Sequence, residues 1–214
     1  SHSTPALAGV ASLMYRYLQT EYSVAEPSAA LMKGYMMAHP TYLTGVSGNG
    51  NLPTNVQGYG MPNLGLAFDD STSRIIRDQL AEDAFDNSGQ EREFLLAVAD
   101  PSKPVRVAMV YSDAPGAVTG APQVNNLDLV NGGNTYLGNR FSGAFSTTGG
   151  SADTANNYEA VFLDAGASGL LTVKVRAFNI AGNGIPGNAD STDQDFALVC
   201  SNCTEANGFG LQVT

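Results

Sequence analysis

The spacing of apolar residues changes once along the chain, from a helical pattern to alternation, and this change constrains the fold more than any other feature. Up to about residue 70, two long apolar runs, 6–18 and 27–39, have the length and composition of helices. Beyond about residue 90, short apolar segments with a period of two are separated by turns rich in Gly and Asn. These predicted strands are Phe94–Val98, Val105–Tyr111, Leu127–Val130, Ala160–Leu163, Leu170–Ala177 and Phe196–Val199. The sequence therefore predicts an α+β fold by segments, with an antiparallel β-sandwich or jelly roll in its second part.

The same pattern divides the chain into parts. Residues 1–70 form a helical part, and residues 91–203 form a β-domain. Charged residues crowd between Asp69 and Arg92, so residues 71–90 are predicted to be a solvated connector with some strand in it. Residues 204–214 are rich in Gly and are predicted to form a tail.

The first helix is unusual because it is apolar nearly all round. The sequence Ser3-Thr4-Pro5 is typical of a helix start, and Arg16 is the one charge between Ala6 and Leu18. Such a helix needs protein on every side. We therefore expect it to lie inside a larger protein, of which this chain is a truncated part.

The charge balance limits the classes of partner. The 214 residues carry a formal net charge of −10, which repels the phosphates of a nucleic acid. The same charge favours solubility, and some of the carboxylates could also hold calcium. Neither an apolar run of about 18 residues nor a signal-peptide pattern occurs, so we expect no membrane span.

The two cysteines, Cys200 and Cys203, form a single CxxC. One such pair cannot supply the four ligands of a structural zinc site. A thioredoxin-like motif opens a helix, whereas this pair closes a predicted strand. A local disulfide in an oxidising compartment is favoured over free thiols, and both alternatives stay open.

Ser1 precedes the first helix, where unpaired N–H groups and the positive end of the helix dipole could stabilise an oxyanion. Local physics alone makes an ordinary terminal residue the simpler interpretation. The residue pattern changes this interpretation, because it resembles the serine block of the subtilases, Gly-Thr-Ser-x-(Ala/Ser)-(Thr/Ala)-Pro-x-x-(Ala/Ser)-Gly. The residues in register are Ser1, Ser3, Thr4, Pro5, Ala8 and Gly9.

Two later segments are similar to the same family. Pro27–Ala38 resembles the helix that follows the serine block, and Gln57–Asn63 resembles the Gly-Tyr-Gly run that closes subtilase catalytic domains. The β-part resembles the C-terminal jelly-roll barrel of some alkaline subtilases. That resemblance is carried by Lys103–Gly116, Val124–Val130, Tyr136–Asn139, Asn156–Phe162 and Val173–Asn179.

The resemblance implies a secreted serine endopeptidase that cleaves polypeptides through a Ser-His-Asp triad, with Ser1 as nucleophile. In this family the triad His, the triad Asp and the oxyanion Asn lie upstream of the serine, so they are absent from this chain. His2 fills a variable position, and His39 is predicted to cap a helix end. The isolated chain is therefore expected to be inactive and to pair with the missing N-terminal catalytic portion or with itself.

A structural calcium site is the second chemical hypothesis. Asn126 and Asp128 lie at the start of a predicted strand, and Asp113 and Glu159 lie at matching ends of other strands. Calcium binds six to eight such oxygens. The alternative is that these side chains bond local backbone groups, as Asx turns do.

A different class of function stays open: the β-domain could be a non-catalytic binding module for protein or carbohydrate. The chain has no Trp, and its aromatic residues are scattered along this part. The scattered aromatic residues are Tyr136, Phe141, Phe145 and Tyr158. An aromatic platform for sugar is therefore not evident from the sequence.

Overall fold

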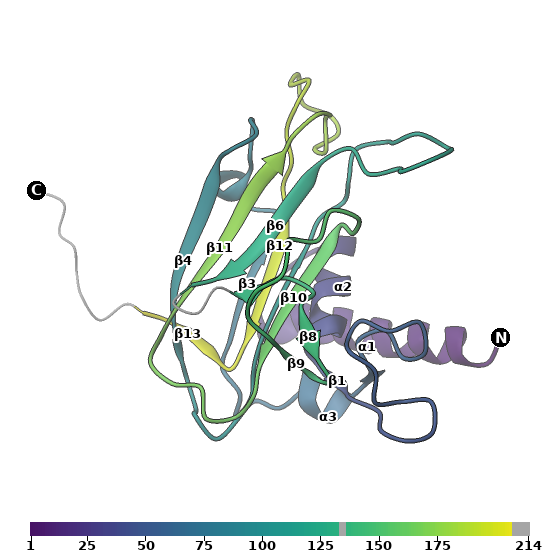
Figure 1. The fold of residues 1–214 in the computed structure, drawn as a ribbon, viewed down its shortest axis with the longest axis vertical. Coiled ribbons are helices and arrows are strands. Elements are labelled where there is room, and N and C mark those ends of the chain that lie inside the picture. Colours follow the sequence, from purple (N-terminus) through teal and green to yellow (C-terminus); the bar gives the residue numbers. More distant parts are fainter. Residues whose placement is uncertain (133–135, 207–214) are drawn as a thin grey trace, which may run out of the picture.

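The computed structural model describes residues 1–132 and 136–206, and its strands build two facing sheets (Figure 1). Within these residues, one sheet has four strands in the order β10 (Tyr158–Leu163), β5 (Val105–Val110), β12 (Ala197–Ser201) and β3 (Arg74–Asp78). The other has five strands in the order β13 (Cys203–Glu205), β4 (Glu91–Val98), β11 (Leu170–Asn179), β6 (Asn126–Asn131) and β7 (Tyr136–Leu137). All pairings between these strands are antiparallel, and neither sheet closes into a barrel within the described residues.

The helices cover the outer face of the four-stranded sheet. They are α1 (Ser3–Glu21), α2 (Ala29–Ala38) and the short α3 (Leu64–Ala67). Two small two-stranded sheets lie in the loops, β1 (Pro40–Thr41) with β2 (Met61–Pro62), and β8 (Phe141–Ser142) with β9 (Phe145–Ser146). A 3₁₀ turn follows β3 at Ala81–Asp83. The fold is α+β and sandwich-like, with a layer of helices outside one sheet.

Alternation along the central strands produces two cores. Val107 and Met109 of β5 point between the two sheets, where they meet Val173 and Val175 of β11. The alternate residues Ala108 and Val110 of β5 lie on the other face with the helices. Since successive residues of a strand point to opposite faces, one strand serves both cores. The helical part and the sandwich therefore share the four-stranded sheet.

Helix α2 begins at a side-chain cap and packs closely on the sheet. Ser28 Oγ accepts a hydrogen bond from Leu31 N at 2.9 Å, and Ser28 N donates to Asp78 of β3 at 2.9 Å. A Cβ on Gly34 would lie 3.5 Å from a methyl group of Val110, so the helix backbone runs close to β5. The predicted helix 27–39 is confirmed, and it ends before Pro40, which cannot continue it.

The six predicted strands are confirmed as parts of β4, β5, β6, β10, β11 and β12. The segment 71–90, which we assigned to a solvated connector with some strand, contains β3, an edge strand of the four-stranded sheet, and the fully buried Phe85. Thr204 and Glu205, which we assigned to the tail, pair with β4. Ala206 is described, and the rest of the predicted tail, residues 207–214, lies outside the described residues.

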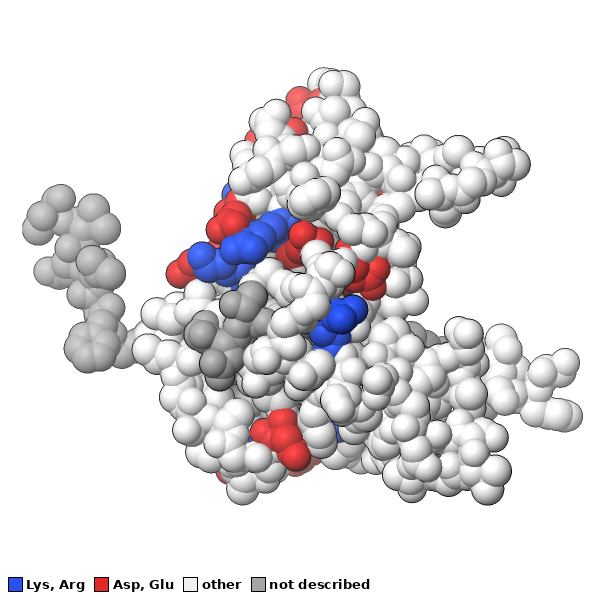
Figure 2. Space-filling view, in the orientation of Figure 1, with Lys and Arg blue, Asp and Glu red and all other residues white. Residues whose placement is uncertain are grey.

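Charges on the outer face of the five-stranded sheet are mixed. Lys174 of β11 lies 2.8 Å from Glu93 of β4, and Arg176 lies 2.6 Å from Glu91. Figure 2 shows basic and acidic side chains side by side on the face toward the viewer, with uncharged residues over most of the remainder. Such exposed pairs contribute little to stability. None of the helices in the described part of the chain is long and apolar enough to cross a membrane.

Candidate functional site

Ser1 lies at the exposed end of α1. Residues 1–9 are all exposed, and Met14 is the first fully buried side chain of the helix. Figure 1 shows this end of α1 extending away from the sheets. Among the described residues, no side chain caps the N-terminus of α1, and its first turn has no acidic residue. The unpaired N–H groups and the positive end of the helix dipole are therefore open beside the Ser1 hydroxyl.

His39 is buried at the C-terminal end of α2 and is only 2% exposed. Its ring bonds the carbonyl oxygen of Tyr35 through Nδ1 at 2.7 Å, and Arg74 Nε donates to its Nε2 at 3.0 Å. Burial is the main cause that lowers the pKa of His39 to about 3, and the charges of Arg74 and Arg106 act in the same direction. The ring is neutral at physiological pH, and both of its nitrogens are occupied. His39 is the C-cap residue of α2, which confirms the prediction that it caps a helix.

His2 is exposed, and within the described residues no hydrogen bond orients its ring. A general base must be held within hydrogen-bond reach of the proton that it takes. Neither histidine meets this requirement for Ser1: His2 is not held, and His39 is enclosed in a different part of the molecule. The described residues thus contain no histidine that is placed to activate Ser1.

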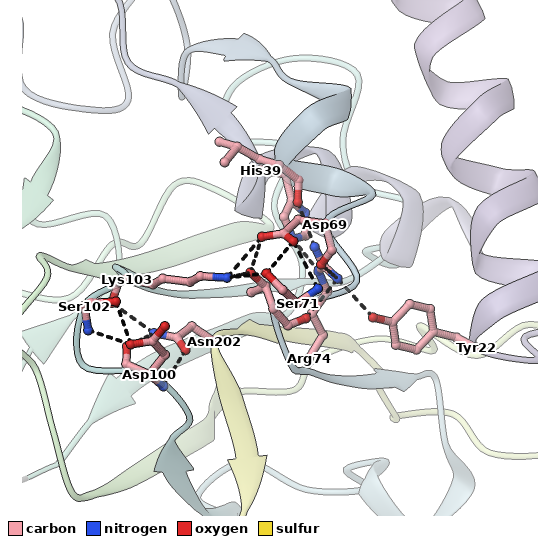
Figure 3. Close-up of polar contacts among 11 residues, drawn as sticks. Tyr22, His39, Asp69, Ser71, Arg74, Asp100, Ser102, Lys103 and Asn202 are labelled. Carbon is pink, nitrogen blue, oxygen red and sulfur yellow. Dashed lines mark hydrogen bonds and ion pairs between the residues drawn. The ribbon is translucent and has the colours of Figure 1, made fainter.

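Arg74 joins the helices to β3, and sequence reasoning missed it. Its guanidinium donates to Tyr22 Oη at 3.2 Å, to the Leu66 carbonyl at 2.7 Å and to the Asp69 carbonyl at 3.1 Å, besides His39 (Figure 3). These acceptors come from the ends of α1, α2 and α3. A buried Arg surrounded by neutral acceptors keeps its charge while satisfying its donors. The one available signal was the Ile-Ile pair after Arg74, which favours a strand over a solvated connector.

Lys103 forms a second network of polar contacts beside that of Arg74. Its ammonium lies 3.1 Å from Asp69 Oδ2 and 2.8 Å from each of Ser71 Oγ and Thr72 Oγ1 (Figure 3). The hydroxyls of Ser71 and Thr72, and after them the Lys103 ammonium, bond the Asp69 carboxylate and hold its pKa well below its usual range. A cavity of about 200 Å³ lies between the Lys103 network and Arg106. The polar groups here are bonded to one another, so we interpret the network as structural.

The four proposed calcium ligands do not converge on one point. Both oxygens of Asp113 accept backbone hydrogen bonds at 2.8 Å, one from Val124 N and one from Asn125 N. Asp113 therefore fixes a loop, which is the alternative that the sequence left open. Asn126 begins β6 and is buried, and its side-chain oxygen lies 3.4 Å from Gln123 Nε2. No group of three or more His, Cys, Asp or Glu side chains in the described part of the chain is arranged to hold a metal ion.

Asp128 and Glu159 do lie close together, although they come from different sheets. Glu159 is 1% exposed, and its Oε2 accepts a hydrogen bond from Leu129 N at 2.7 Å. Glu159 Oε1 and Asp128 Oδ1 are buried, and neither has a hydrogen-bond partner among the described residues. A Cβ on Gly138 would lie 2.0 Å from Glu159 Oε2, so only Gly lets the chain pass this carboxyl. The pair is thus a compact site with two unused oxygens.

The electrostatics of this pair follow from burial. Burial raises the pKa of Glu159 to about 9, and the nearby carboxylates of Asp128 and Asp153 add to the effect. Burial also raises the pKa of Asp128 to about 6, although the charge of Arg176 opposes the rise. Without a cation, Glu159 carries a proton at neutral pH. Sequence reasoning missed Asp153, because the loop that contains it has no periodic pattern.

Cys200 and Cys203 form a disulfide with a Cα–Cα distance of 5.6 Å, and both side chains are fully buried in the core between the sheets. The disulfide therefore ties the end of β12 to the start of β13, which belong to different sheets.

The aromatic residues of the β-domain pack inward. Phe141 is buried, and Phe145 and Tyr158 pack against the core under the helices. Tyr136 packs against the core between the sheets. These four residues do not form an exposed stacking surface, so they offer a carbohydrate no platform.

No known protein family model matches the chain, and no curated protein matches it.

Proposed function

We propose that this chain is the C-terminal part of a secreted subtilisin-like serine endopeptidase, with Ser1 as the nucleophile. The resemblance of the first nine residues to the serine block suggests this function. The observation that carries it further is the exposed apolar half of α1, which begins next to Ser1.

The exposed half of α1 has the surface of a buried helix. Leu7 is 43% exposed and Leu13 is 54% exposed, and Ala6 and Ala8 are exposed between them. A Cβ on Gly9 would meet nothing within 4 Å. Covering the exposed half of each leucine would contribute about 0.7–1.5 kcal/mol, half the value for a whole side chain, so burial of this face against a partner surface is favourable. The small residues Ala8 and Gly9 would let a neighbouring backbone approach closely.

The proposed mechanism gives Ser1 one role and assigns the others to upstream residues. The Ser1 hydroxyl attacks the scissile carbonyl of a polypeptide, a histidine takes its proton, and an aspartate orients that histidine. The helix N-terminus beside Ser1 contributes donors toward the oxyanion, together with an asparagine side chain. By the resemblance, these three partners belong to the missing N-terminal catalytic portion, so residues 1–214 alone are proposed to be inactive.

The β-sandwich is proposed to be a jelly-roll module that supports the catalytic part. Its four-stranded sheet shares a core with α1 and α2, which supports a positioning role. A binding module that moved independently of the helices would have a core separate from theirs.

Calcium is proposed as a structural cofactor at Asp128 and Glu159. Their two unpartnered buried oxygens suit a hard cation. Further oxygens would have to come from backbone groups and water. Addition of Ca²⁺ should raise the melting temperature of the wild type and leave that of Glu159→Gln unchanged, and Asp86→Asn, an exposed acid, serves as the matched control. A wild type that does not respond to Ca²⁺ would contradict the site.

The nucleophile is tested with a fluorophosphonate probe on the protein that carries its upstream sequence. We expect labelling at Ser1, located by mass spectrometry, and loss of labelling in Ser1→Ala. The matched control is Ser3→Ala, two residues away, which should keep the label. Residues 1–214 alone should stay unlabelled. Labelling that survives Ser1→Ala, or labelling of residues 1–214 alone, would refute the assignment of roles.

A further inference from the structure

Lys33 differs from the other two lysines because it lacks a carboxylate partner. Lys103 lies 3.1 Å from Asp69, and Lys174 lies 2.8 Å from Glu93. The Lys33 ammonium instead lies over the ring of Tyr158, 3.6 Å from its centroid. Among the described residues this ring is its only partner, and burial lowers the pKa of Lys33.

A half-buried cation without a counter-ion is unfavourable, and the ring face offsets only part of that cost. The carboxylate of Asp153 does not supply the counter-ion. It accepts hydrogen bonds from the side-chain amides of Asn139 and Asn156, each at 2.7 Å. The positive charge of Lys33 therefore has no counter-ion among the described residues.

A cavity of about 460 Å³ lies next to Lys33. Its walls come from three separate segments: α2, the loop 53–59, and residues 156–158 at the start of β10. Met37 and Pro53 give it apolar surface, Tyr59 and Tyr158 give aromatic rings, and Asn55 gives an amide. This volume lies within the range of small-ligand sites, and the walls offer polar and apolar surface in similar amounts.

We propose that this cavity binds an organic monocarboxylate, whose carboxylate pairs with Lys33 and whose apolar body lies against Met37 and the tyrosines. One ammonium matches one negative charge, whereas a phosphate dianion would meet a single cation in a chain with a net charge of −10. Met37 and the two tyrosine rings give an organic body contacts that a small inorganic anion would not make. This inference does not depend on the protease proposal, because it uses neither Ser1 nor the exposed half of α1.

The test is calorimetric titration of the full chain with 3-phenylpropionate and with N-acetylphenylalanine, each beside its neutral amide, and with inorganic phosphate. We expect at least one acid to bind about tenfold or more tightly than its amide, since a charge-assisted hydrogen bond is worth at least that factor. Lys33→Met should remove this difference. Lys33→Arg, which keeps the charge, should retain most of it, and so should the matched control Lys174→Met.

A second readout reports the same event without relying on the variants. A carboxylate that pairs with Lys33 should draw its ammonium away from the ring of Tyr158. The ring proton resonances of Tyr158 should therefore shift on titration with the acid and not with the amide. Equal binding of acid and amide, binding that Lys33→Met retains, preference for phosphate, or no binding of either acid would each overturn the proposal.

Discussion

Replacing Glu159 with Gln should make stability less dependent on pH in the absence of divalent cations. Burial raises the pKa of this carboxyl from 4.5 to about 9 on folding. The folded-state pKa lies above the unfolded value, so the native state is fully favoured below pH 4.5 and loses this advantage as the pH rises toward 9. In that window the unfolded chain releases a proton that the native state keeps, which lowers the free energy of unfolding by about 1.4 kcal/mol per pH unit.

Between about pH 5 and about pH 7.5 the wild type should therefore lose about 3 kcal/mol that Glu159→Gln does not lose. Gln keeps an acceptor for Leu129 N and cannot ionise, but an unpaired buried amide N–H costs about 1–3 kcal/mol. The variant should thus be no more stable than the wild type near the lower pH, and more stable near the higher one.

The assay is urea unfolding in EDTA, followed by far-ultraviolet circular dichroism because the chain has no Trp. Asp86→Asn, which changes an exposed carboxyl, should show no such difference between the two pH values. A free-energy difference between Glu159→Gln and wild type that is the same at both pH values would refute the reasoning. If calcium binds at this pair, added Ca²⁺ should stabilise only the wild type and reverse the order at the higher pH.

Three further predictions concern the other parts of the chain. Arg74→Met should lower the free energy of unfolding by about 3–5 kcal/mol, because the buried acceptors around the guanidinium lose their donors; the exposed Arg16→Met should change it by less than about 0.5 kcal/mol in the same urea titration. Leu13→Lys should weaken self-association of residues 1–214 in light scattering and leave the unfolding curve unchanged, and a wild type that is monomeric at every concentration would contradict this expectation. Ser at both Cys200 and Cys203 should cost about 2 kcal/mol, the amount expected for so short a loop, and a reducing agent should lower wild-type stability by a similar amount.

The strands could be predicted because alternation is a local property. In β11, Val173 and Val175 face the core while Lys174 and Arg176 face solvent, and this pattern is readable without any knowledge of the partner strands. Strand β3 was harder, because Arg74 and Arg77 give it the composition of a surface segment. Their side chains are satisfied by groups from α1, α2 and the turn after β3, and the sequence does not reveal those contacts.

The carboxylates show more clearly what could not be predicted from the sequence. Asp113 and Glu159 were grouped because both lie at strand ends, but the structure gives them opposite environments. Asp113 accepts two backbone N–H groups, whereas Glu159 keeps one oxygen unpaired. Which environment a carboxylate meets depends on how the sheets are stacked and on a close passage at Gly138, and both are long-range features.

The two ends of α1 differ in a way that bears on how Ser1 would be held. At the C-terminal end, Met14 and Leu18 are fully buried, Tyr17 Oη donates to Asp70 at 2.6 Å, and Tyr22 accepts from Arg74. This half is tied to the sandwich, while the half next to Ser1 is exposed apolar surface. If the proposed protease is correct, the sandwich fixes the axis of the helix that carries the nucleophile. A change in Arg74 that leaves the protein folded should then lower kcat of the protein with its upstream sequence more than it raises KM, since it would misplace Ser1 without touching the substrate.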